Sequence, residues 1–75
     1  MRVPNKIYTY NDSIISKFPV ILRELKKEEL SVLSLYKRVE TQIEGINEYL
    51  QILDYLFAMN KIEMDYKKGV LIYVD

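Results

Sequence analysis

Glu63 and Asp65 are the first residues to consider for chemistry, because they alternate along one face of a predicted strand. Two carboxylates at this spacing can donate oxygen ligands to a hard cation such as Ca²⁺ or Mg²⁺. Such sites need further oxygen donors, and the residues around this pair do not supply them. An exposed polar strand face is the simpler interpretation, and we expect no metal site.

The residues that usually carry catalysis are missing from this chain. It has no histidine and no cysteine, so the commonest general base, thiol nucleophile and transition-metal ligands are absent. Its serines therefore have no base to activate them, and two isolated glycines make no phosphate-binding loop. We expect a protein that is not an enzyme and that needs no cofactor.

Charge argues against recognition of DNA. Eleven basic residues balance eleven acidic ones, and residues 44–60 contain Glu44, Glu48 and Asp54 but no lysine or arginine. Binding to duplex DNA depends on cations that replace counterions on the phosphates. We expect no direct sequence-specific DNA binding. Lys67 and Lys68 can touch a phosphate, but a solvated turn is the simpler interpretation of this pair.

Seventy-five residues make one domain, spanning 1–75, with a small core and no disulfide to brace it. No apolar run approaches the roughly 20 residues of a membrane span, and the first residues lack a signal peptide's apolar core. We therefore expect a cytoplasmic protein without membrane contact, whose marginal fold a partner completes.

The periodicity predicts an α+β domain with a winged-helix-like layout. Residues 6–10 form a short strand, and residues 13–27 form a helix that kinks or restarts at Pro19. A second helix follows the capping residue Ser31 and ends near residue 40, and a third spans 45–59 before a C-cap at Asn60. Alternation over 62–66, a turn at 67–69 and the strand 70–74 predict a hairpin, with Gly69 at the turn.

The third helix is apolar around more than one stripe. Its main stripe, which we expect to face the core, comprises Ile46, Tyr49, Leu50, Leu53, Leu56 and Phe57. A second apolar face comprises Ile52, Tyr55 and Met59, spaced i, i+3, i+7. This face meets either a partner or, equally well, the N-terminal strand or the hairpin.

The last strand is also apolar on both sides. Alternation separates Val70, Ile72 and Val74 from Leu71 and Tyr73. Two-faced strands are usually covered on both sides, and residues 6–10 can supply one cover. Tyrosine is enriched at interface cores, and the chain has seven tyrosines. The candidate partner-binding residues are thus Ile52, Tyr55, Met59, Tyr8, Tyr10, Leu71 and Tyr73.

Three stretches resemble one protein family: Pro4-Asn5-Lys6, the serine-led helix start Ser13-Ile14-Ile15, and the segment YLFAMNKIEMD at 55–65 with its hairpin. They are similar to the small middle components of bacterial ABC-three component systems, over nearly the whole chain. The family's glycine-containing segment after the serine is replaced by Lys17-Phe18-Pro19.

The resemblance implies a non-enzymatic adaptor in a defence assembly against phage or plasmids. Its implied partners are a coiled-coil ATPase similar to SMC and Rad50 proteins and an effector subunit, often a nuclease, in the organisation of Lamassu systems. The alternative is a winged-helix transcription regulator or antitoxin that binds DNA through its wing. The absence of lysine and arginine from residues 44–60 favours the adaptor.

Overall fold

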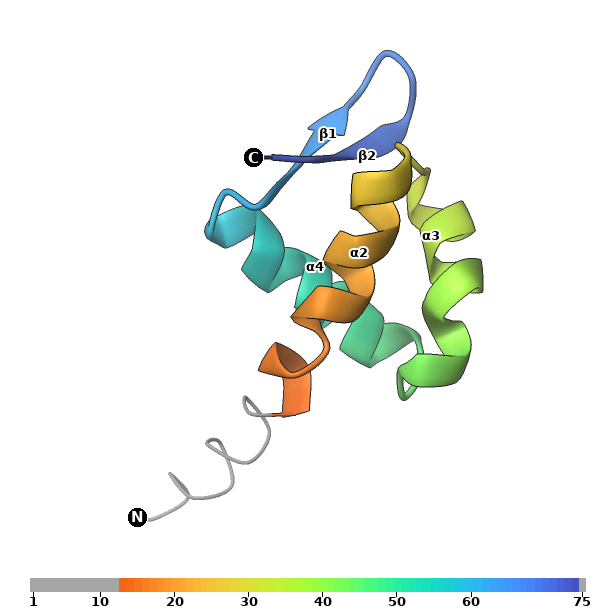
Figure 1. Cartoon of the computed structure of the whole chain (residues 1–75), viewed down its shortest axis with the longest axis vertical. Helices are drawn as coiled ribbons and strands as arrows, with labels where there is room; N and C mark the ends of the chain where they lie inside the picture. Colours follow the sequence, from red (N-terminus) through yellow and green to blue (C-terminus); the bar gives the residue numbers. More distant parts are fainter. Residues whose placement is uncertain (1–12, 75) are drawn as a thin grey trace.

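The computed structural model describes residues 13–74 and has the expected α+β fold (Figure 1). Three helices, α2 (Phe18–Lys27), α3 (Val32–Val39) and α4 (Ile46–Ala58), precede a hairpin of β1 (Ile62–Asp65) and β2 (Val70–Tyr73). Residues 13–15 are also helical, and a 3₁₀ turn spans Glu40–Gln42. The strand predicted at 6–10, with Tyr8 and Tyr10, lies outside the described residues.

The helix predicted over 13–27 restarts, as Pro19 indicates. The chain turns at Ser16 and Lys17, where the Lys17 N–H donates to the Ile14 carbonyl at 3.0 Å, and α2 then begins. Pro19 lies in the first turn of α2. Backbone N–H groups there have no helical acceptor, so the missing N–H of proline costs nothing.

The predicted cap of α3 is confirmed, and the left-handed residue predicted at the end of α4 is Asn60, although the C-cap itself is Met59. The Ser31 side chain accepts from the Ser34 N–H at 3.1 Å and begins α3. Asn60 has a φ of 58° and follows α4. The Lys61 N–H donates to the Leu56 carbonyl at 2.9 Å, and the Asn60 N–H donates to the Phe57 carbonyl at 3.0 Å. This pair of bonds is a Schellman ending, which needs a left-handed residue where Asn60 stands.

The hairpin confirms the predicted strands, with a four-residue turn. β1 and β2 pair antiparallel with Ile62 opposite Tyr73 and Asp65 opposite Val70. Tyr66, predicted to continue the first strand, lies in the turn instead. The Asp65 carboxylate accepts from the backbone N–H groups of Lys67 and Lys68 at 3.0 and 3.1 Å and so holds the chain in the turn.

A third segment joins the hairpin at one point. Leu30, between α2 and α3, forms an antiparallel bridge with Leu71, and the Leu71 N–H donates to the Leu30 carbonyl at 2.7 Å. Leu71 is fully buried. The bridge therefore fixes the hairpin to the helical part of the domain through the backbone as well as through side chains.

The core lies where the three helices and the hairpin meet. Its buried members are Ile14, Ile21, Leu25, Leu30, Leu35, Val39, Ile43, Tyr49, Ile52, Leu53, Leu56, Ile62 and Leu71. The three helices and both strands each supply at least one of them, and the 3₁₀ turn supplies none. Among residues 13–74 no polar or charged residue is fully buried. Burial of apolar surface is accordingly the main stabilising contribution to this fold.

The predicted rotation of α4 about its axis is partly wrong. Tyr49, Leu53 and Leu56 are buried as expected, and Ile52, which was assigned to the second face, is buried with them. Ile46, Leu50 and Phe57, which were assigned to the core, are exposed. The buried set lies on one face of the helix, because its members are three, four and seven residues apart. Periodicity allows both stripes, and contacts with the neighbouring elements select one.

Candidate functional site

The apolar side chains that α4 leaves exposed form two flanks beside its buried stripe. The Leu50 flank comprises Ile46, Leu50 and Phe57, which are 47%, 45% and 36% exposed. The Tyr55 flank comprises Tyr55 and Met59, which are 40% and 44% exposed. At 100° per residue these sets lie on opposite sides of the stripe. The helix is therefore apolar over a wider arc than its own core covers.

The start of α2 borders the Tyr55 flank. The rings of Phe18 and Tyr55 are 6.2 Å apart and tilted by 48°. This is within the range for favourable edge-to-face contact between aromatic rings. A surface hollow on the other side of Tyr55 is lined by Gln51, Asp54, Tyr55 and Ala58. The flank thus combines an aromatic ring held by a neighbour with a hollow that has polar groups at its edge.

An ion pair at the N-terminal end of α4 fixes the position of α2. The Lys17 ammonium lies 2.8 Å from a Glu48 carboxylate oxygen, and both side chains are largely buried. The same oxygen accepts from the Glu44 N–H at 2.9 Å. Burial raises the pKa of Glu48, but hydrogen bonds from Glu44 and Lys17 outweigh it and hold this pKa below its ordinary value. The carboxylate is therefore charged at neutral pH and joins the two helices.

Tyr49 is a structural residue rather than a candidate for binding. Its hydroxyl donates to the Val32 carbonyl at 2.6 Å, and its ring lies 4.8 Å from that of Tyr36. Burial raises the pKa of Tyr49 well above its ordinary value, so the phenol stays neutral. The hydrogen bond from this hydroxyl to a carbonyl in the first turn of α3 holds α3 against α4.

Exposed charges between α2, α3 and the hairpin form a separate network. The Arg38 guanidinium pairs with Glu24 at 3.3 Å and also with Glu28. The pKa of Arg38 is accordingly raised. Lys68 at the hairpin turn lies 3.6 Å from Glu29. The acidic groups near the end of α2 are thus paired with cations at the surface, and such surface ion pairs contribute little to stability.

The structure places the seven predicted partner-binding residues in three different environments. Ile52 and Leu71 are fully buried, so neither belongs to an exposed surface. Tyr55 is exposed on α4 and Met59 at its C-cap, and Tyr73 is half-buried on β2. Tyr8 and Tyr10 lie outside the described residues. The sequence analysis assigned the Leu50 flank to the core. The width of the apolar arc on α4 could have indicated that part of it is exposed.

The acidic side chains and the helices in the described part of the chain bear on metal binding and on membrane crossing. Residues 13–74 contain no group of three or more His, Cys, Asp or Glu side chains placed to hold a metal ion. Glu63 and Asp65 lie on the hairpin face opposite the core. None of the helices between residues 13 and 74 has the length and apolar character that a membrane crossing requires.

Comparison with protein families identifies the chain. Residues 3–71 match the family described as ABC-three component (ABC-3C) system Middle Component 7. No curated protein and no solved structure matches the sequence. The match includes Lys17-Phe18-Pro19, where the helix restarts, and extends through the hairpin to Leu71. The chain therefore belongs to the Middle Component 7 family of ABC-three component systems.

Proposed function

We propose that this chain is a non-enzymatic adaptor subunit of a multi-component defence system and acts through protein–protein contacts. Its partners in this proposal are an SMC/Rad50-like coiled-coil ATPase and an effector, such as a nuclease, in a Lamassu-like assembly directed against phage or plasmids. Family membership supports a role among several components. The observation that supports action through protein–protein contacts is the pair of exposed apolar flanks of α4.

The flanks favour a partner because of their residue types and their breadth. Isolated exposed apolar residues are normal, but four large ones on a 13-residue helix, with Met59 at its C-cap as a fifth, are more than its own core needs. Tyrosine, phenylalanine and methionine are enriched at the centres of interfaces. The polar face between the flanks carries Asn47, Gln51 and Asp54 and suits the rim of such a contact.

We also propose that the domain is a winged helix whose α4 has lost the role of reading DNA. The order of three helices and a hairpin, with Leu30 bridged to Leu71, supports this assignment. In DNA-binding relatives of this layout, a helix such as α4 presents donors to base edges. Here α4 has no basic residue and carries Glu48 and Asp54. Its surface is apolar and acidic, which suits a protein partner.

A second candidate function is a winged-helix DNA-binding regulator or antitoxin. The hairpin turn favours it, because Tyr66 is 88% exposed beside Lys67 and Lys68. Fluorescence anisotropy with duplex DNA at about 150 mM salt separates the two functions. We expect no binding tighter than the roughly 10⁻⁴ to 10⁻⁶ M of non-specific contacts. A submicromolar complex that depends on sequence would replace the adaptor with the regulator.

Co-purification with the other components of the system tests the adaptor. We expect Tyr55→Glu with Met59→Lys, or Leu50→Glu with Phe57→Lys, to weaken the complex at least about a hundredfold, because each buried anchor contributes roughly 2 kcal/mol. Each pair leaves the net charge unchanged and replaces side chains that are exposed in the free chain. Circular dichroism should therefore show a folded protein in both cases.

The matched control replaces two other exposed apolar residues in the same way. Ile15→Lys with Leu33→Glu changes residues that are 53% and 64% exposed and that lie outside α4. We expect this variant to bind as the wild type does. Unchanged binding of both α4 variants contradicts the proposed contact, and equal loss in the control shows that the flanks have no special role.

A further inference from the structure

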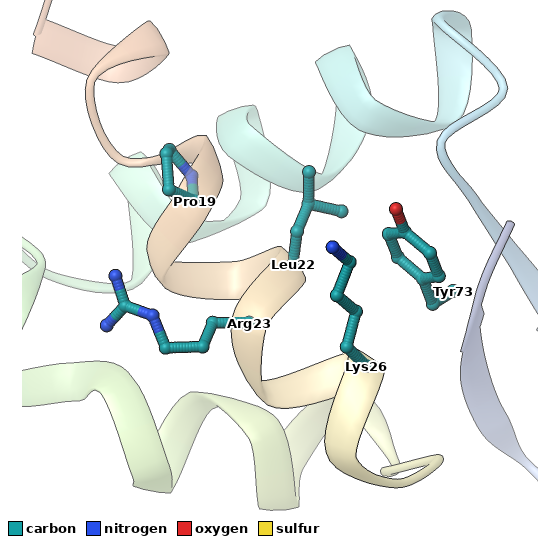
Figure 2. A pocket seen from close by; sticks show the side chains of 5 residues that line it. All are labelled: Pro19, Leu22, Arg23, Lys26 and Tyr73. Atoms are coloured by element: carbon teal, nitrogen blue, oxygen red, sulfur yellow. The ribbon is translucent and has the colours of Figure 1, made fainter. Parts of the chain in front are cut away.

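A groove between α2 and β2 is lined by both apolar and positively charged side chains. Four of its lining residues lie on one side of α2: Pro19, Leu22, Arg23 and Lys26. The fifth, Tyr73, comes from β2 (Figure 2). The groove has a volume of about 320 Å³, at the lower end of the range for ligand sites. It is separate from both flanks of α4.

The groove joins an apolar floor to two cations. Lys26 lies beside the Tyr73 ring, with its ammonium 5.2 Å from the ring centroid, and Leu22 points toward the same ring (Figure 2). Arg23 extends from α2 in a different direction, so its charge lies at the other edge of the groove (Figure 2). The groove therefore has one cation, Lys26, over its aromatic ring and a second, Arg23, at its other edge.

The two cations are available to a ligand. Among residues 13–74 the ion pairs formed by Glu24, Glu28, Glu29 and Glu48 involve other cations, and neither Arg23 nor Lys26 takes part in them. The acidic groups near the end of α2 are thus already paired with Lys27, Arg38 and Lys68. This arrangement leaves a local positive charge on a chain whose net charge is zero.

We propose that this groove binds an acidic segment of a partner polypeptide, with carboxylates on Arg23 and Lys26 and an apolar side chain on Leu22 and Tyr73. Charge complementarity identifies the occupant as acidic, since guanidinium and ammonium groups form their strongest hydrogen bonds with anions. The apolar floor favours a polypeptide over nucleic acid, because a phosphate backbone gains nothing from leucine and proline. The inference rests on the proposed adaptor role but concerns a different surface.

Fluorescence anisotropy with the full chain tests the groove without any partner subunit. The probe is a short labelled peptide that alternates glutamate with leucine, and its comparison peptide has glutamine in place of glutamate. We expect a dissociation constant of about 10 to 100 µM for the acidic peptide and at least about tenfold weaker binding of the comparison peptide. Raising the salt from about 50 to about 300 mM should weaken the acidic complex, since exposed charges are screened.

The double substitution Arg23→Glu with Lys26→Glu should weaken binding of the acidic peptide at least about tenfold. Its matched control, Lys37→Glu with Lys67→Glu, makes the same change in net charge at two exposed lysines away from the groove. We expect the control to bind nearly as the wild type does. Equal loss in both variants, or no binding by the wild type at about 1 mM peptide, overturns the proposal.

Two further outcomes are informative. The wild type could bind a labelled DNA duplex more tightly than the peptide, and the Arg23→Glu, Lys26→Glu variant could lose that binding. This result assigns the groove to nucleic acid and overturns the peptide site. The α4 variants could leave the complex with the other components intact while the wild-type chain still binds the acidic peptide. This result contradicts the proposed α4 contact and supports the peptide site in the groove. The two proposals are therefore distinguishable.

Discussion

Tyr49 and Tyr55 lie on the same helix, six residues apart, yet their environments differ completely. Tyr49 is fully buried, with its hydroxyl on the Val32 carbonyl and its ring against Tyr36. Tyr55 is 40% exposed, and the Phe18 ring lies beside it. Residue type does not distinguish the two positions. Their difference is set by where α2 and α3 pack around α4.

The same contrast applies to the helix as a whole. The buried stripe of Tyr49, Ile52, Leu53 and Leu56 joins α4 to the rest of the domain, whereas the two flanks present similar residue types to solvent. Core packing accounts for the stripe, whereas the flank residues keep 36–47% of their surface exposed even where a neighbour such as the Phe18 ring lies beside them. If the proposed contact with a partner is correct, α4 uses one side of its axis for folding and the two flanks beside it for association.

The largest effect expected from this comparison is on stability. Ile52→Ala should lower the free energy of unfolding by about 2 to 5 kcal/mol, because it removes fully buried methyl groups and leaves a cavity. Met59→Ala, on the Tyr55 flank, should change it by less than about 1 kcal/mol. Urea denaturation followed by circular dichroism measures both. Similar losses in the two variants would show that the flank belongs to the core.

A smaller effect is expected from the hydroxyl of Tyr49. Tyr49→Phe removes a buried hydrogen bond to the Val32 carbonyl, which keeps its place in the first turn of α3, so we expect a loss of about 1 kcal/mol. Tyr66→Phe is the matched control, because its side chain is highly exposed at the hairpin turn. It should be neutral in the same denaturation experiment. A neutral Tyr49→Phe would mean that the bond does not hold α3 to α4.

Local features of the fold were predictable from the sequence. Ser31, Asn60 and Gly69 act where they were expected, as a helix cap, a left-handed helix end and a turn residue. The restart of the helix near Pro19 was predictable for the same reason. Each of these depends on the backbone preference of one residue or on a bond to a near neighbour, and such preferences can be read without tertiary contacts.

Non-local features were not predictable. The bridge between Leu30 and Leu71 joins single residues 41 positions apart in the numbering, and no periodicity marks it. The rotation of α4 was missed because two overlapping stripes fit a helical period equally well. The groove was missed because Tyr73 meets α2 only through packing of the hairpin. Its helical half, spaced i, i+3, i+4 and i+7 from Pro19, was visible in the sequence.

The smallest effect on stability is expected from Glu48, which lies where the Tyr55 flank of α4 meets the start of α2. The pKa of Glu48 is lowered in the folded protein, so its contribution to stability is present above the unfolded-state value of about 4.5 and is lost as the pH falls through the folded pKa. Because the side chain is only 10% exposed, salt screens the pair with Lys17 less than it screens surface pairs.

Glu48→Gln keeps the shape of the side chain and removes its charge. We expect it to lower stability by about 1 kcal/mol at neutral pH, where the charged hydrogen bonds are lost, and by much less below pH 4. Thermal melts across the acid range measure this difference. Glu24→Gln is the control, since the pKa of Glu24 is also lowered but its partners Lys27 and Arg38 are exposed, so its loss should be smaller and more sensitive to salt. A Glu48→Gln variant that loses as much stability at acid pH as at neutral pH would assign the effect to packing. In that case the ion pair would not be what holds α2 beside the Tyr55 flank.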